Sequence, residues 1–168
     1  LVFGPFRERT LAHASVRGRM VWNESRAAIT TLSAGLTADG SSEDAGHLAG
    51  LVVIESWRTV SPRERLGWRL SYAGSSQVPG YTAVASNPNG GLFRGNPDLD
   101  REISHNFEAG VILSGPDAWI DATVFYRMDQ DLVDWVYASS ATPFGSRFAE
   151  NVDIDTFGLD VFAAWEAG

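Results

Sequence analysis

A strict alternation of apolar and polar residues dominates the segment Gly95–Gly110, GNPDLDREISHNFEAG. The segment opens with a turn signal, Gly95 and Asn96 before Pro97, because proline fixes its own φ and disfavours a helical Asn96. One face then carries Ile103, His105, Phe107, Ala109 and Val111, and the other carries Glu102, Ser104, Asn106, Glu108 and Gly110. A period of two indicates a strand whose two faces meet different environments. The apolar face meets either a protein core or lipid.

Six other segments are predicted strands, several longer than usual for globular proteins. They are Thr10–Trp22, Arg26–Ala38, Leu48–Val60, Arg65–Tyr72, Ala118–Tyr137 and Phe148–Trp165. The register of Leu48–Val60 stays open. Either Leu48, Val52 and Ile54 face the apolar side, or Leu51, Val53 and Trp57 do, which would bring Glu55 into the apolar row.

The predicted connections alternate in length. Asn23–Ser25, Ser61–Glu64 and Ser114–Asp117 are short, whereas Asp39–Gly46, Ser75–Asp100 and Ala138–Arg147 are long. An up-and-down barrel in an outer membrane has short turns on one side and long loops on the other. Trp22, Trp57, Trp68, Trp119 and Trp165 lie near the short turns or the closing end, as in an aromatic girdle, although Trp119 falls in the polar row.

Composition excludes several classes of protein. The net charge of -8 argues against a nucleic-acid partner, which needs a basic patch. The chain has no cysteine, so disulfides and thiolate metal sites are absent. No apolar run is long enough for a membrane-spanning helix. Both ends look cut, and we expect a fragment of a longer chain.

The run from Pro79 to Gly110 resembles the barrel of TonB-dependent outer-membrane receptors. The shared residues are Pro79, Gly95-Asn96-Pro97, Leu99, Glu102, Asn106, Glu108 and Gly110. Downstream, Val124–Val136 and the residues Asn151-Val152 and Thr156–Asp160 resemble later strands of the family, with Asp160 where glutamate is more usual. The likeness extends over Leu66–Trp165 and looks closest to the cobalamin-receptor-like branch.

This resemblance implies a barrel of about 22 strands, filled by a plug and powered by TonB. We therefore expect an all-β, antiparallel up-and-down meander, a partial segment of about seven strands of a large transmembrane β-barrel. Residues 1–168 would belong to one barrel domain, its C-terminal half, with the plug and Ton box outside this chain. The implied partners are the plug of the full-length chain, TonB, outer-membrane lipid and a small-molecule ligand, in a Gram-negative bacterium.

Charged and polar residues of the non-lipid row are expected to face the lumen, because near the bilayer midplane Arg or Lys would cost about 2–4 kcal/mol each. They are Arg17, Arg19, Arg65, Arg69, Glu102, Asn106, Glu108, Asp121, Arg127 and Asp160. Plug contact and plain solvation are both open for them. Ligand contacts are expected from the long connections. The candidates are Tyr81, Phe93, Arg94, Trp135, Tyr137 and Phe144.

Metal and catalytic sites are not expected. His13, His47 and His105 share no ligand spacing. Closely spaced acids could offer oxygen ligands to Ca²⁺ in the loops, but an acidic strand face has the same pattern. These acids are Asp98, Asp100 and Glu102, then Asp129, Asp131 and Asp134, then Asp153 and Asp155. Motifs of hydrolases and nucleotide-binding loops are absent, so we predict no enzyme.

The predicted function is TonB-dependent import of a scarce ligand, a cobalamin-like corrinoid or a metal–siderophore complex. Two alternatives stay open. A passive porin would share the barrel without a plug, and a soluble β-sheet binding domain would bury the apolar rows in a core. A membrane barrel would instead leave Phe107, Val111, Ile120, Val124, Leu159 and Val161 as one exposed apolar band.

Overall fold

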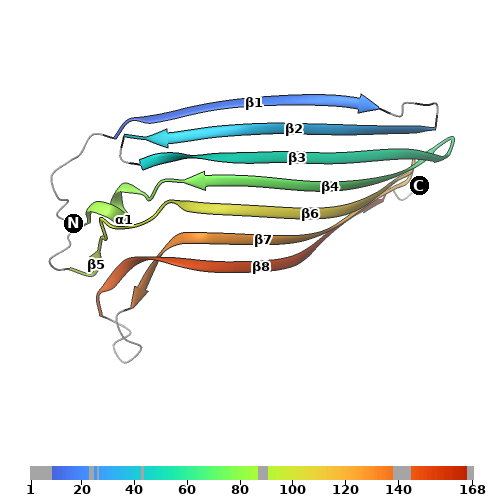
Figure 1. The fold of residues 1–168 in the computed structure, drawn as a ribbon. Coiled ribbons are helices and arrows are strands. Elements are labelled where there is room, and N and C mark those ends of the chain that lie inside the picture. Colours follow the sequence, from blue (N-terminus) through green and yellow to red (C-terminus); the bar gives the residue numbers. More distant parts are fainter. Residues whose placement is uncertain are drawn as a thin grey trace.

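The protein forms one curved antiparallel layer with no second layer among the described residues (Figure 1). The computed structural model describes residues 9–22, 25, 27–42, 44–86, 91–137 and 145–165. The long strands are β1 (Leu11–Trp22), β2 (Ala28–Ser41), β3 (Asp44–Ser61), β4 (Glu64–Gln77), β6 (Glu102–Ser114), β7 (Ala118–Tyr137) and β8 (Arg147–Trp165). Each pairs antiparallel with the next long strand in the chain. The predicted meander and its seven long strands are confirmed.

The connection between β4 and β6 is more ordered than the sequence predicted. It contains a short helix, α1 (Tyr81–Ala85), and a two-residue strand, β5 (Phe93–Arg94). The connection folds back on itself, because the Gly95 N–H donates to Ser86 O at 2.6 Å and the Asn96 N–H donates to Ala83 O at 2.7 Å. β5 then pairs in parallel with the start of β8. Both elements lie at one end of the sheet, here called the outer end (Figure 1).

Among the described residues, no helix combines the length and the hydropathy of a membrane span.

The prediction of a long loop at Asp39–Gly46 was wrong. β2 continues to Ser41 and β3 begins at Asp44, and these two residues are themselves paired. The Asp44 carboxylate stabilises the turn by accepting hydrogen bonds from the N–H groups of Ser41 at 3.3 Å and Gly46 at 2.9 Å. Gly46 has φ +78°, a left-handed conformation that glycine adopts without steric cost. The connection is therefore a tight turn despite its acidic, loop-like composition.

The register of β3 is now defined. Val52 lies opposite Ala34 and Tyr72, and Ile54 lies opposite Leu32 and Leu70. Leu48, Val52 and Ile54 therefore share the apolar face, and Glu55 and Trp57 lie on the polar face. This is the first of the two registers that the sequence left open.

The apolar face of the sheet is uncovered. The six residues expected to form a continuous band lie in register on this face and are 41–64% exposed: Phe107, Val111, Ile120, Val124, Leu159 and Val161. The buried apolar residues of the described chain are Ala49, Ala83, Ile112 and Ala149. A soluble sandwich would bury the band against a second sheet, and the described residues provide no such sheet.

The tryptophans divide between the two faces, so the expected girdle is incomplete. Trp68 and Trp165 lie on the apolar face, whereas Trp57 and Trp119 lie on the polar face with ring centroids 6.3 Å apart. The Trp57 indole donates to the Glu55 carboxylate at 2.6 Å, and the Arg65 guanidinium lies 5.0 Å from the Trp57 ring centroid. Trp57 and Trp119 therefore belong to the polar face and not to an aromatic girdle in contact with lipid.

Candidate functional site

All ten residues expected to face a lumen lie on the polar face. One row of paired positions crosses the sheet from Arg17 on β1 to Asn106 on β6 and Arg127 on β7. The register places Arg19, Arg65, Arg69, Glu102, Glu108, Asp121 and Asp160 on the same side. Contact of these residues with a plug stays a prediction.

A hollow of about 210 Å³ lies at mid-height on the polar face, lined by Arg69, Glu108, Asp121, Thr123 and Asp160 among others. The Glu108 carboxylate already has two hydrogen-bond donors, Ser71 Oγ at 3.1 Å and Asn106 Nδ2 at 2.7 Å. The Nε atom of Arg69 is buried and has no acceptor among the described residues. The hollow therefore combines acidic side chains with a guanidinium nitrogen that is not hydrogen-bonded.

At the outer end, three of the predicted ligand residues come together around Arg147. The Arg147 guanidinium lies 4.6 Å from the Tyr137 ring centroid and 5.7 Å from that of Phe93, and it donates to the Tyr137 hydroxyl. The Phe93 and Trp135 rings make an edge contact with centroids 5.2 Å apart. We call Phe93, Trp135, Tyr137 and Arg147 the outer aromatic cluster. It can offer ring surface and positive charge to a ligand.

The other ligand candidates are not part of this cluster's contacts. Arg94 pairs with Phe148 instead, with its guanidinium 5.1 Å from the ring centroid, and its Nε is buried without an acceptor among the described residues. Tyr81 begins α1. Phe144 lies outside the described residues. Arg147 and Phe148 were missed because the sequence placed them at the boundary between a loop and a strand, where no periodicity marks a contact.

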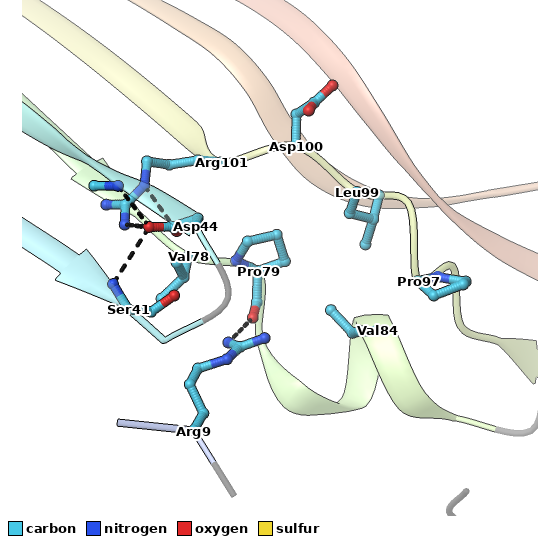
Figure 2. A pocket seen from close by; sticks show the side chains of 11 residues that line it. Arg9, Ser41, Asp44, Val78, Pro79, Val84, Pro97, Leu99, Asp100 and Arg101 are labelled. Carbon is cyan, nitrogen blue, oxygen red and sulfur yellow. Dashed lines mark hydrogen bonds and ion pairs between the residues drawn. The ribbon is translucent and has the colours of Figure 1, made fainter. Parts of the chain in front are cut away.

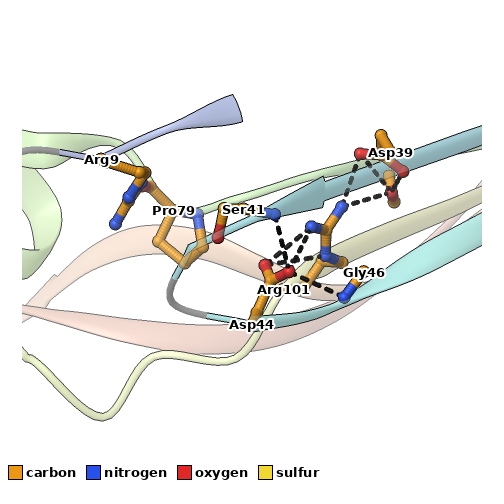
Figure 3. Close-up of polar contacts among 8 residues, drawn as sticks. Arg9, Asp39, Ser41, Asp44, Gly46, Pro79 and Arg101 are labelled. Atoms are coloured by element: carbon orange, nitrogen blue, oxygen red, sulfur yellow. Dashed lines mark hydrogen bonds and ion pairs between the residues drawn. The ribbon is translucent and has the colours of Figure 1, made fainter. Parts of the chain in front are cut away.

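A second residue that sequence reasoning missed is Arg101, which lies just before β6. Its guanidinium donates to Asp39 Oδ2 at 2.6 Å, to Ser76 Oγ at 2.9 Å and to both Asp44 oxygens at 2.7 and 2.8 Å (Figure 3). Its side chain is 11% exposed. We call Arg101, Asp39, Asp44 and Ser76 the Arg101 clasp. It joins three stretches of chain, from the β2–β3 turn, β4 and the start of β6.

Charges in the clasp stabilise one another. The hydrogen bond from Arg101 is the main cause that holds the pKa of the Asp44 carboxyl below its ordinary value of 3.8, against the opposing effect of burial. The same bond is the main cause that raises the pKa of the Arg101 guanidinium. Both groups therefore remain charged at neutral pH.

Next to the clasp is a hollow of about 380 Å³ (Figure 2). The β2–β3 turn forms one wall through Ser41, Asp44 and Gly46, and the β4–β6 connection forms the other, which includes the apolar Val78, Val84 and Leu99. Arg9, just before β1, also lines it and donates to Pro79 O at 2.8 Å. The hollow thus lies between two separate connections at the outer end.

Two of the closely spaced acids have partners within the chain, and a Ca²⁺ site in the loops stays a prediction. Among the residues described, no group of three or more His, Cys, Asp or Glu side chains could hold a metal ion. Asp129 pairs with Arg127 at 2.8 Å, and Asp153 accepts from the Asp131 N–H at 3.0 Å. His105, on the apolar face, hydrogen-bonds with the Tyr72 hydroxyl at 2.9 Å.

A single curved sheet with one exposed apolar face and one charged face defines part of the wall of a membrane β-barrel. A family model described as "TonB dependent receptor-like, beta-barrel" matches residues 19–166. The chain belongs to this family, whose members are outer-membrane proteins of Gram-negative bacteria.

A solved structure with a similar fold is that of the copper transporter OprC. The TM-score is 0.63 at 15% sequence identity, over 95% of this chain and 27% of that chain. This chain therefore spans about a quarter of that protein. No curated protein matches the sequence.

Proposed function

We propose that the complete receptor imports a scarce ligand across the outer membrane with energy passed from TonB. Residues 1–168 would form part of the C-terminal half of its barrel, around a plug from the same full-length chain. The observation that carries the proposal is the family match over residues 19–166, on a sheet whose apolar face is exposed as lipid contact requires. Import would proceed by binding and gated passage, without covalent chemistry.

For the ligand we propose a cobalamin-like corrinoid or a metal–siderophore complex. The outer aromatic cluster supports this class, because aromatic rings in edge contact beside a guanidinium suit a large ligand with apolar surface and negative charge. A metal-containing ligand also agrees with the copper transported by the structural neighbour. The polar face, including Glu102 and Glu108, would contact the plug.

Uptake by cells that produce the full-length receptor tests both parts. Labelled cobalamin, a labelled ferric siderophore and copper(II) ions are supplied to cells with and without functional TonB. We expect uptake of one probe that falls to background without TonB. Equal uptake in both strains would contradict active import and indicate a passive channel.

The site is tested by Trp135→Ala in the same cells, because this change removes the ring that contacts Phe93. We expect uptake of the transported probe to fall. Trp68→Ala removes the same side chain from the apolar face far from the cluster and should leave uptake unchanged. Equal uptake by the two variants would contradict the assignment of the outer aromatic cluster.

A further inference from the structure

The wall divides at its outer end into two separately paired parts. β2 and β3 remain paired as far as Ser41 and Asp44, and β4 and β6 as far as Gln77 and Glu102. Pairing between β3 and β4, however, stops at Leu51 and Ala73. The outer residues of β3, 44–50, therefore have no backbone ladder to the outer residues of β4, 74–77. We call this gap the β3–β4 seam.

Glycines lie on both sides of the seam where it begins. A Cβ atom built on Gly74 would lie 3.4 Å from Gly50 N and 3.5 Å from Gly50 O, so the two backbones approach closely without a regular ladder. Glycine has the widest range of backbone conformations, and a third glycine, Gly46, lies further out on β3. The base of the seam is suited to bending.

Side-chain hydrogen bonds, in place of a backbone ladder, close the seam. The Arg101 clasp crosses the seam from Arg101, just before β6, to Asp39 and Asp44, and Ser76 Oγ on β4 donates to Asp39 Oδ1 at 3.0 Å (Figure 3). The bond from Arg9 to Pro79 O is a further tie at the same end. All three guanidinium nitrogens of Arg101 donate to acceptors of the clasp. Loss of Arg101 would leave two carboxylates together without their shared cation.

The 380 Å³ hollow has one wall on each side of this division. Its hairpin wall is Ser41, Asp44 and Gly46, and its other wall belongs to the β4–β6 connection (Figure 2). Movement of the hairpin away from β4 would therefore open the hollow. The outer parts of β1, β2 and β3 stay paired with one another, so they would have to move together. We propose that these parts, residues 10–16, 36–42 and 44–50, move as a flap about the glycines of the seam, and that Arg101 is the latch that holds the flap closed over the hollow.

Distances between spin labels in the full-length receptor in lipid test the flap. This chain has no cysteine, so it adds no competing labelling site. One label pair, at Leu48 and Gln77, spans the seam. A second, at Val52 and Leu70, reports on the paired part of the same two strands. Both pairs are measured in the natural background, in Arg101→Gln and in Arg127→Gln, which breaks an ion pair that is not part of the clasp.

We expect Arg101→Gln to lengthen the Leu48–Gln77 distance by about one strand spacing, roughly 5 Å, and to leave Val52–Leu70 unchanged. Arg127→Gln should change neither distance. An unchanged Leu48–Gln77 distance in Arg101→Gln would overturn the proposal. Equal lengthening of both pairs would also overturn it, because that result means general loss of the sheet. Neither result bears on TonB dependence, so the flap can be disproved without disproving the proposed function, and the reverse also holds.

Discussion

Two glycines of this sheet, Gly67 and Gly158, lie directly beneath aromatic rings of neighbouring strands. On the polar face, a Cβ atom on Gly158 would lie 2.3 Å from Cζ of Phe125, and one on Gly67 would lie 2.8 Å from Cε3 of Trp57. The rings thus occupy the space that side chains would fill. A glycine opposite an aromatic residue weakens a strand by itself, and the ring that covers it restores contact across the pair.

Gly158→Ala should therefore destabilise the receptor. The added methyl group overlaps the Phe125 ring, and overpacking of this kind costs about 1–3 kcal/mol. The free energy of unfolding of the full-length receptor, measured by denaturant titration in detergent micelles, checks the value. Gly18→Ala is the matched control, because no atom lies within 4 Å of a Cβ built there. Equal stability of the two variants would show that Phe125 moves aside without cost.

At the scale of elements, the strands and the short turns Ser61–Glu64 and Ser114–Asp117 were predictable, but the Asp39–Gly46 connection and the order within the β4–β6 connection were not. Period-two alternation predicted both ends of β7 correctly and the C-terminal end of β6 to within one residue. It did so because the two faces of a strand meet different environments. The Asp39–Gly46 segment looked like a loop, since its short polar residues favour turns. Its order depends on Arg101, 57 residues beyond Asp44, and local pattern carries no information on such a partner. The pairing of β5 with β8 and the cluster around Arg147 were missed for the same reason.

The Arg101 clasp also predicts how the outer end responds to acid. The folded-state pKa of Asp44 lies below its ordinary value of 3.8, so the contribution of the clasp is complete above that pH. It is lost as the pH falls through the lowered pKa. We expect the Leu48–Gln77 label distance to be constant from pH 8 to about pH 5 and to lengthen only below 3.8.

Asp44→Asn provides the control for this acid response. The variant cannot ionise at this position, so its label distance should already be long at neutral pH and should change little with acid. A transition centred above pH 5 in the natural background would contradict the assignment to Asp44.

At the scale of the whole molecule, the two faces of the sheet should tolerate charge very differently. Val161 and Phe162 are neighbours on β8 with nearly equal exposure, 58% and 59%, but they lie on the apolar and polar faces respectively. Val161→Arg would place a cation in lipid, at a cost of about 2–4 kcal/mol near the midplane. Phe162→Arg would place the same cation in the lumen opposite Asp121, where water and a carboxylate are available.

Unfolding of the two full-length variants in lipid vesicles measures this difference. We expect Val161→Arg to lower the unfolding free energy by about 2 kcal/mol more than Phe162→Arg does. This difference is the low end of the cost of a cation in lipid. Equal losses would mean that both faces meet the same solvent, and the sheet would then not be a barrel wall.

The meander has a further consequence for how such walls change during evolution. Apart from the two residues of β5, every strand in the described part of the chain pairs only with its nearest long neighbours. Duplication or loss of one hairpin would keep the direction of all later strands. Only one new pair of neighbouring strands would have to form backbone hydrogen bonds. Because the diameter of a barrel grows with its number of strands, such an event would resize the pore and leave the remaining wall as it was.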